Sequence, residues 1–116
     1  DIFYEYNVDL GLWGHEHTYE RSYPVYKHIS YSQNISNTNG TSYYHNPFAP
    51  VHIISGAAGN KEMNNVPVDF TNNTWSAVQS CAYGFSYMKI HNSTHLHITQ
   101  INGANGSTID DLWIIK

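Results

Sequence analysis

Short stretches in which apolar and polar residues alternate recur along the chain, and they predict a protein built mainly of β-strands. The pattern is clearest in the last third, where strands are expected at 83–91, 95–101 and 109–115. Polar turn residues separate these strands at 92–94 and 102–107. Because such turns join successive strands directly, we expect an antiparallel meander.

The first half predicts fewer regular elements. Apolar runs at 8–13 and 50–55 predict two further strands, the first of them buried. Residues 1–7 have apolar positions at helical spacing and predict the end of a helix. Residues 19–26 are expected to be extended, with Pro24 favouring an edge or irregular strand.

The remaining segments predict loops. Residues 27–49 are rich in Tyr, Ser, Asn and Thr without a clear period, so we expect a long surface loop there, and a second loop at 61–74. Residues 56–60 are mostly small and are expected to let the backbone pass close to another part of the molecule. The pattern as a whole predicts one helix end followed by mostly antiparallel β-structure.

Length and composition narrow the class of protein. The chain has 116 residues, of which 41% are hydrophobic, so it can form one domain, or part of one, with a modest core. The net charge is -4 with only five Lys and Arg and no basic run, which argues against a nucleic-acid partner. No apolar stretch approaches the roughly 20 residues of a membrane span. Because the chain begins inside an expected helix, we expect residues 1–116 to be a single partial domain.

The stretch Gly14-His15-Glu16-His17 is the main candidate for chemistry. Neutral imidazole suits zinc and iron, and a loop after a strand can direct two imidazoles at one metal or at two adjacent metals. Gly14 is expected to free the backbone to turn at this point. Two ligands do not complete a metal site, so further ligands must come from elsewhere.

A second pair, His95-Leu96-His97, has a different interpretation. It lies in an expected strand in which Leu96 and Ile98 alternate inward, so His95, His97 and Thr99 are expected to face solvent and not to bind metal. His91 could point near this pair, although nothing in the pattern demands it. The other histidines are expected to be surface or hydrogen-bonded polar residues: His28, His45 and His52. The single cysteine, Cys81, excludes an internal disulfide and is expected to be a small buried apolar residue.

Four residues next to the histidines allow two interpretations. Glu16 and Glu20 could accept an N–H from an imidazole and so orient it. Alternatively Glu20 and Arg21 could pair locally and fix the loop, and this structural role is the one we favour. Tyr19 is expected to contribute packing.

The sequence also contains five Asn-x-Ser/Thr sequons, each in an expected loop or turn: Asn34, Asn39, Asn72, Asn92 and Asn105. Acceptors of N-glycosylation have to be exposed, so this distribution favours a glycoprotein of the secretory pathway, either secreted or lysosomal.

Residues 8–26 resemble the last metal motif of the purple acid phosphatases, which belong to the calcineurin-like metallophosphoesterases. The family pattern Gly-His-x-His-x-Tyr-Glu-Arg is present in full at residues 14–21. The resemblance is greatest to the animal iron/zinc purple acid phosphatase-like branch, and residues 27–49 match it least. It continues through residues 54–62, 83–85, 92–97 and 110–113.

This resemblance implies an α+β fold, the β-rich C-terminal portion of the metallophosphoesterase sandwich, with a binuclear centre at the sheet edge. His15 would bind the divalent metal (Zn, Fe or Mn) and His17 the ferric iron. The implied activity is hydrolysis of phosphate monoesters by attack of a metal-bound hydroxide.

The family's earlier motifs have no counterpart in this chain. They supply two aspartates, a tyrosine, an asparagine and a further histidine as ligands. We therefore expect the N-terminal half of the catalytic domain to be missing, no catalytic residue besides the two ligands, and little activity of the chain alone. The alternative is a truncated, non-catalytic glycoprotein domain that keeps the β-rich half of the fold.

Overall fold

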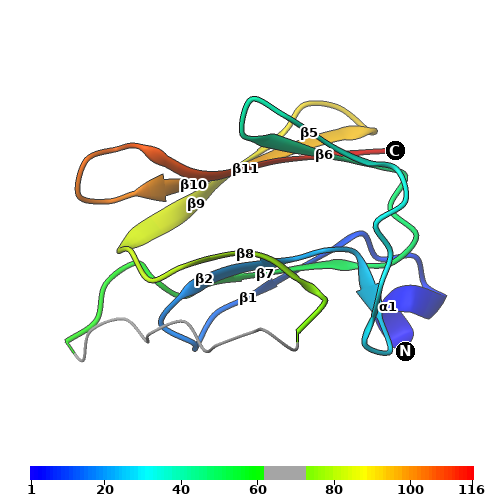
Figure 1. Cartoon of the computed structure of the whole chain (residues 1–116), viewed down its shortest axis with the longest axis horizontal. Coiled ribbons are helices and arrows are strands. Elements are labelled where there is room, and N and C mark those ends of the chain that lie inside the picture. Colours follow the sequence, from blue (N-terminus) through cyan, green and yellow to red (C-terminus); the bar gives the residue numbers. More distant parts are fainter. Residues whose placement is uncertain (62–72) are drawn as a thin grey trace.

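Two β-sheets packed face to face make up most of the structure, a computed structural model that describes residues 1–61 and 73–116 (Figure 1). The lower sheet in Figure 1 has the order β1-β7-β2-β8, formed by Leu10–Trp13, Val51–Ser55, Tyr19–Ser22 and Ser76–Ser80. The upper sheet has the order β5-β6-β11-β10-β9, formed by Ile35–Thr38, Thr41–His45, Thr108–Ile115, His95–Asn102 and Gly84–Ile90. A small hairpin adds β3 (Val25–Tyr26) and β4 (Ile29–Ser30).

Several expected elements are confirmed. A single helical turn, α1 (Ile2–Glu5), precedes β1, and β7 forms within the strand expected at 50–55. Strands β9, β10 and β11 pair antiparallel in succession, which is the expected meander. The expected α+β class with a β-rich body is therefore correct.

The expectation of a long surface loop at 27–49 is wrong, because this segment contains three strands. Strands β5 and β6 form a hairpin, and β6 then pairs in parallel with β11. Tyr44 is 1% exposed and faces the core, while Ser42 beside it in the alternation is also buried. In sequence, a strand rich in Tyr, Ser and Thr resembles a polar loop. It is distinguished only by the burial of every second side chain, which depends on the strands that pack against it.

Three other expectations need correction. The first strand is not buried throughout, since Leu12 and Trp13 are 52% and 48% exposed on the edge strand β1. Strand β2 is not an edge strand but lies between β7 and β8, and Pro24 falls in the bend after it. The alternative expectation of an irregular strand is met, because the pairing of β2 with β8 shifts register between Arg21 and Ser22. Strand β8 was not expected. The loop expected at 61–74 lies largely outside the described residues, as does the sequon at Asn72.

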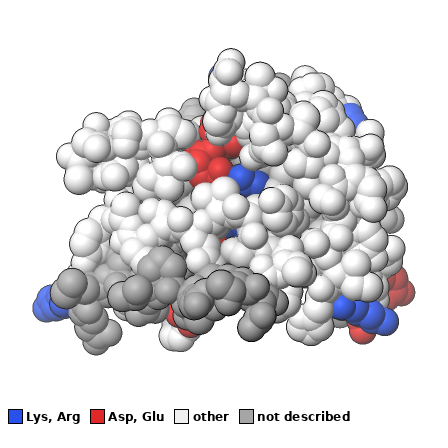
Figure 2. All heavy atoms as spheres, viewed as in Figure 1, with Lys and Arg blue, Asp and Glu red and all other residues white. Residues whose placement is uncertain are grey.

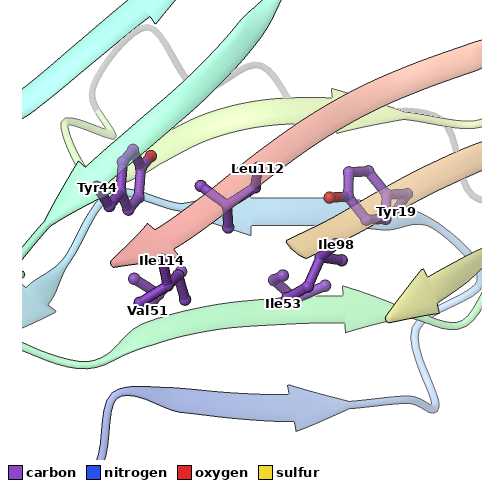
Figure 3. Packing of buried hydrophobic residues seen from close by; sticks show 7 residues of the cluster. All are labelled: Tyr19, Tyr44, Val51, Ile53, Ile98, Leu112 and Ile114. Carbon is purple, nitrogen blue, oxygen red and sulfur yellow. The ribbon is translucent and has the colours of Figure 1, made fainter. Parts of the chain in front are cut away.

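The core lies between the two sheets (Figure 3). Val51 and Ile53 point up from β7, and Ile98, Leu112 and Ile114 point down from β10 and β11; all five are at most 4% exposed. Complete burial of such a side chain contributes about 1.5 to 3 kcal/mol. The alternation of the strands explains the arrangement, because every second residue of each strand reaches this layer.

A buried ion pair crosses the same layer. Arg21 of β2 is 2% exposed and donates to both carboxylate oxygens of Asp110 on β11, from Nε at 2.6 Å and from Nη2 at 2.8 Å. The Tyr19 hydroxyl donates to the same carboxylate at 2.6 Å. The remaining guanidinium N–H groups reach the Tyr44 hydroxyl and Ser42 Oγ on β6. Three strands of two sheets are thus joined by one charged group.

The surroundings hold these groups in fixed protonation states. Burial lowers the pKa of Arg21, but its hydrogen bonds and ion pair with Asp110 outweigh that effect and raise the pKa overall. Burial, with Asp110 nearby, raises the pKa of Tyr19 far above its ordinary value, and burial raises the pKa of Tyr44 to about 12. Both phenols therefore stay neutral donors or acceptors throughout the physiological pH range.

Replacing Asp110 with Asn should destabilise the chain by about 3 to 5 kcal/mol, because the buried guanidinium loses its counter-charge. The replacement Arg21→Met should cost a similar amount, and the double variant should cost clearly less than the sum of both. Urea denaturation measures all three. Lys27→Met at an exposed position is the control. Additive losses would show that Arg21 and Asp110 do not act as a pair.

Candidate functional site

The histidine loop, residues 14–18, joins β1 to β2 across the end of β7. Strand β7 lies between these two strands and runs parallel to β1, so both end at the same edge of the sheet. The loop has to cross that edge to reach β2, at the left of the lower sheet in Figure 1. His15 is exposed and His17 is half-buried there. Both expected ligands are therefore presented where β1 and β7 end, as the sequence predicted for a loop after a strand.

The absence of a side chain at Gly56 allows the loop to lie against β7. A Cβ atom at Gly56 would lie 1.9 Å from the carbonyl oxygen of Glu16, far inside van der Waals contact. The amide of Gly56 also donates to the carbonyl of Thr18 at 3.0 Å. This confirms the expectation that the small-residue segment 56–60 lets another part of the backbone pass closely.

The unusual backbone conformation lies at His15 and not at Gly14. His15 has φ of 78°, in the left-handed region, whereas Gly14 is absent from the positive-φ residues among those described. Non-glycine residues adopt this region at a cost and keep it when the surroundings demand it. The expectation that Gly14 supplies the turn is therefore not met. The crossing over Gly56 fixes the loop instead.

An aromatic cluster anchors the end of β1 directly before the loop. The indole Nε1 of Trp13 donates to Nδ1 of His52 on β7 at 3.0 Å, and Phe3 of α1 stacks on both rings. His52 is thus a hydrogen-bonded polar residue, one of the two roles expected for it. Burial lowers the pKa of His52, which favours the neutral ring that accepts this bond.

The residues after the histidines serve the core. Tyr19 and Arg21 point inward to Asp110, while Glu20 points to the other side of the sheet and lines a cavity of about 690 Å³ beside α1. Neighbouring residues of a strand face opposite ways, so the local Glu20–Arg21 pair that we favoured does not form. The structural role expected for Tyr19 and Arg21 is nevertheless correct. Glu16 contributes its backbone carbonyl to the contact over Gly56.

Sequence reasoning missed Asp110, which binds both Tyr19 and Arg21. The available signal was a carboxylate at an inward position of an alternating strand, between Thr108 and Leu112. A charge at such a position requires a buried partner. Figure 2 shows acidic and basic side chains next to each other in the recess between the two layers.

Two imidazoles suit iron or zinc, but they do not form a complete site. Among residues 1–61 and 73–116 no group of three or more His, Cys, Asp or Glu side chains could hold a metal ion. His95 and His97 lie on the other sheet and are not brought to the loop. The donor chemistry of His15 and His17 therefore fits iron or zinc, and a complete centre would need further ligands besides these two.

Comparison with known proteins identifies the family. Residues 49–111 match the family described as iron/zinc purple acid phosphatase-like protein C. The chain belongs to this purple acid phosphatase-like family. The matched region begins after the histidine loop and covers β7 to the start of β11, so it supports the resemblance independently of residues 14–21.

Relatives match over the whole length of this purple acid phosphatase-like chain. Human "Acid phosphatase type 7" is 41% identical over 117 residues, which cover 100% of this chain and 25% of that protein. "Purple acid phosphatase 1" of Ipomoea batatas is 32% identical, over 98% of this chain and 24% of its own length. The chain thus spans about a quarter of the length of these relatives.

A solved structure shares the fold. Purple acid phosphatase PPD1 from yellow lupin (Lupinus luteus) seeds superposes with a TM-score of 0.78 at 23% identity, over 98% of this chain and 19% of that one. The two-sheet arrangement is therefore a known one. No helix in the described part of the chain has the length and apolar composition needed to span a membrane.

The replacement Gly56→Ala should destabilise the chain by about 1 to 3 kcal/mol or more, because the new methyl group overlaps the Glu16 carbonyl and forces the loop off β7. Gly14→Ala is the matched control, since no atom lies within 4 Å of a Cβ placed there. Thermal unfolding compares the two variants. Equal stability would contradict the close crossing.

Proposed function

We propose that this chain supplies His15 and His17 as ligands of a binuclear metal centre in an acid phosphatase that hydrolyses phosphate monoesters. The observation that carries the proposal is the histidine loop, held at the end of β1 and β7 by its crossing over Gly56, in a chain of the purple acid phosphatase-like family. Residues 1–116 would be one part of the catalytic domain.

Within this proposal each side chain has a defined task. His15 would bind the divalent metal (Zn, Fe or Mn) and His17 the ferric iron. The bound metals would supply Lewis acidity toward the phosphoryl group and lower the pKa of the attacking water. The chain itself holds the two imidazoles in place, through the Gly56 crossing on one side and the Trp13–His52 anchor on the other.

The side of the sandwich formed by β1 and β9 supports a contribution from further sequence. Leu12 pairs with the core residue Ile53, and Ile90 pairs with Leu96, so both point into the space between the sheets. They are nevertheless 52% and 69% exposed, and Met88 beside them is 42% exposed. Apolar residues at inward positions of edge strands require a cover. A neighbouring part of the same domain would provide it, and with it the missing ligands.

An alternative is a non-catalytic glycoprotein domain that keeps this half of the fold. The described residues offer no third metal ligand, and this favours a non-catalytic domain over a chain that is an enzyme by itself. The two proposals differ in what the coding sequence before Asp1 contains. Asp-x-Gly, Gly-Asp-x-x-Tyr and Gly-Asn-His motifs are expected there for the phosphatase, and their absence would favour the alternative.

In the whole protein, His17→Ala should lower p-nitrophenyl phosphate hydrolysis at least about 100-fold, because a metal ligand is lost. His15→Ala should act similarly, and metal analysis should show loss of iron or of the divalent metal respectively. His28→Ala, at an exposed histidine outside the loop, is the control. Unchanged metal content and activity in His17→Ala would refute the ligand role, and metal-independent turnover of the parent would refute the metal centre.

We further propose that the protein passes through the secretory pathway. Asn34, Asn39, Asn92 and Asn105 are all exposed and lie at turns or bends next to strands, and acceptors of N-glycosylation lie at surface positions of this kind. The protein is expressed in a mammalian secretory host and digested partially with a glycosidase. Its apparent mass should then fall in steps, one for each oligosaccharide removed. Each Asn→Gln replacement should remove one step. Absence of any shift would contradict N-glycosylation.

A further inference from the structure

Histidines gather on the outer face of the five-stranded sheet, the face turned away from the core. Leu96, Ile98 and Ile114 belong to the core or pack against it, so the residues between them in β10 and β11 point outward. The register places the outward residues in two adjacent rows across the strands: Lys89, His97, Trp113 and Tyr43 in one row, and His95, Ile115 and His45 in the next.

Stacked rings hold these rows together. His97 lies flat on Trp113, with ring centroids 4.4 Å apart and an interplanar angle of 9°. His91, directly after β9, stacks on the same indole at 4.8 Å and lies 6.2 Å from His97. Tyr43 stacks with His45 at 6.4 Å. We call this surface the histidine face and define it by Tyr43, His45, Lys89, His91, His95, His97 and Trp113.

Few negative charges oppose the histidine face. Asp111 on β11 is the only acidic residue of the described chain that faces it. The other described acidic side chains lie on α1, on the four-stranded sheet and its loops, or in the core. Asp111 accepts hydrogen bonds from His97 at 2.7 Å, Thr99 at 2.9 Å and Thr41 at 2.8 Å. Its nearest basic partner is therefore His97.

The charge of the face changes strongly with pH. Besides the histidines, the face carries one lysine and one carboxylate, Lys89 and Asp111. Histidine is the side chain whose charge changes between about pH 5 and pH 8, so a surface that carries four histidines becomes more positive in acid. The one described carboxylate that faces them, Asp111, is hydrogen-bonded to His97 and not to Lys89, His45, His91 or His95. Desolvation, together with the charges of Lys89, His97 and His95, lowers the pKa of His91, so its protonation requires acid and would be favoured by a bound anion.

We propose that the histidine face binds an extended polyanion of the sulfated polysaccharide class at acid pH. The basic groups lie on or directly after β9, on β10 and on β6, with β11 between the last two. Neighbouring strands are about 4.8 Å apart, so these groups are spread out and do not converge on one point. A flat array of this kind matches repeated anionic groups along a chain better than a single small anion. The rings lie against one another, which disfavours insertion into a lipid surface. The proposal does not depend on the phosphatase activity.

Heparin is the probe, and the protein is produced in a host that does not glycosylate, so that Asn92 beside the face carries no oligosaccharide. Binding is measured by calorimetry at about pH 5 and about pH 7.5, on either side of the ordinary histidine pKa. We expect at least tenfold tighter binding at the lower pH. The double variant H45Q/H91Q should bind about five- to tenfold more weakly at acid pH and lower the slope of log Kd against log salt by about one to two.

K27Q/H28Q is the matched control, because it removes one lysine and one histidine from the turn between β3 and β4. It should change the affinity less than twofold, whereas an equal loss would show that only net charge matters and would overturn the proposal. Lys89→Gln, at an exposed site outside the ring stack, gives a second test should the double variant fail to fold. No binding at acid pH would also overturn the proposal, as would tighter binding to phosphatidylserine vesicles than to heparin.

Discussion

The buried pair of Arg21 and Asp110 is the constraint on which the rest of the structure depends. It is the point at which the two sheets are joined by charge, and Tyr19, Tyr44 and Ser42 complete its hydrogen bonds. An unpaired guanidinium at 2% exposure would cost several kcal/mol, so β2 and β11 can pack only in the arrangement that brings the two residues together. This register also decides which residues of β6, the neighbour of β11, face the core.

The same strand links the core to the candidate metal site. Strand β2 begins at Tyr19, two residues after His17. Tyr19 and Arg21 both bind the buried Asp110, so the start of β2 has little freedom to move. The loop before them is fixed on its other side by the crossing over Gly56 and by the Trp13–His52 anchor. The Tyr-Glu-Arg part of the motif therefore acts in the folding of the sandwich, and it positions the two histidines by holding the strand that follows them.

Local pattern predicted the elements whose partners are adjacent in sequence. The meander of β9, β10 and β11 has clear alternation and polar turns, so both its strands and its pairing could be predicted. The hairpin of β5 and β6 could not, because its side chains are mostly Tyr, Ser, Thr and Asn. Their burial depends on β11, about 70 residues later. For the same reason the sequence pattern favours Glu20, the neighbour of Arg21 in sequence, as its ion-pair partner, whereas the true partner is Asp110.

The sequence by itself determined the β-rich class, the histidine loop after the first strand, the close backbone approach at residues 56–60 and the family. Each of these depends on residues that are contiguous, because alternation, turn chemistry and motif spacing are local properties. The tertiary structure alone decided that Arg21 pairs with Asp110, that residues 35–45 form strands, and that the turn at the loop lies at His15. It also gathered histidines from three strands on one face. These features depend on the pairing of distant strands, whose register no local pattern specifies.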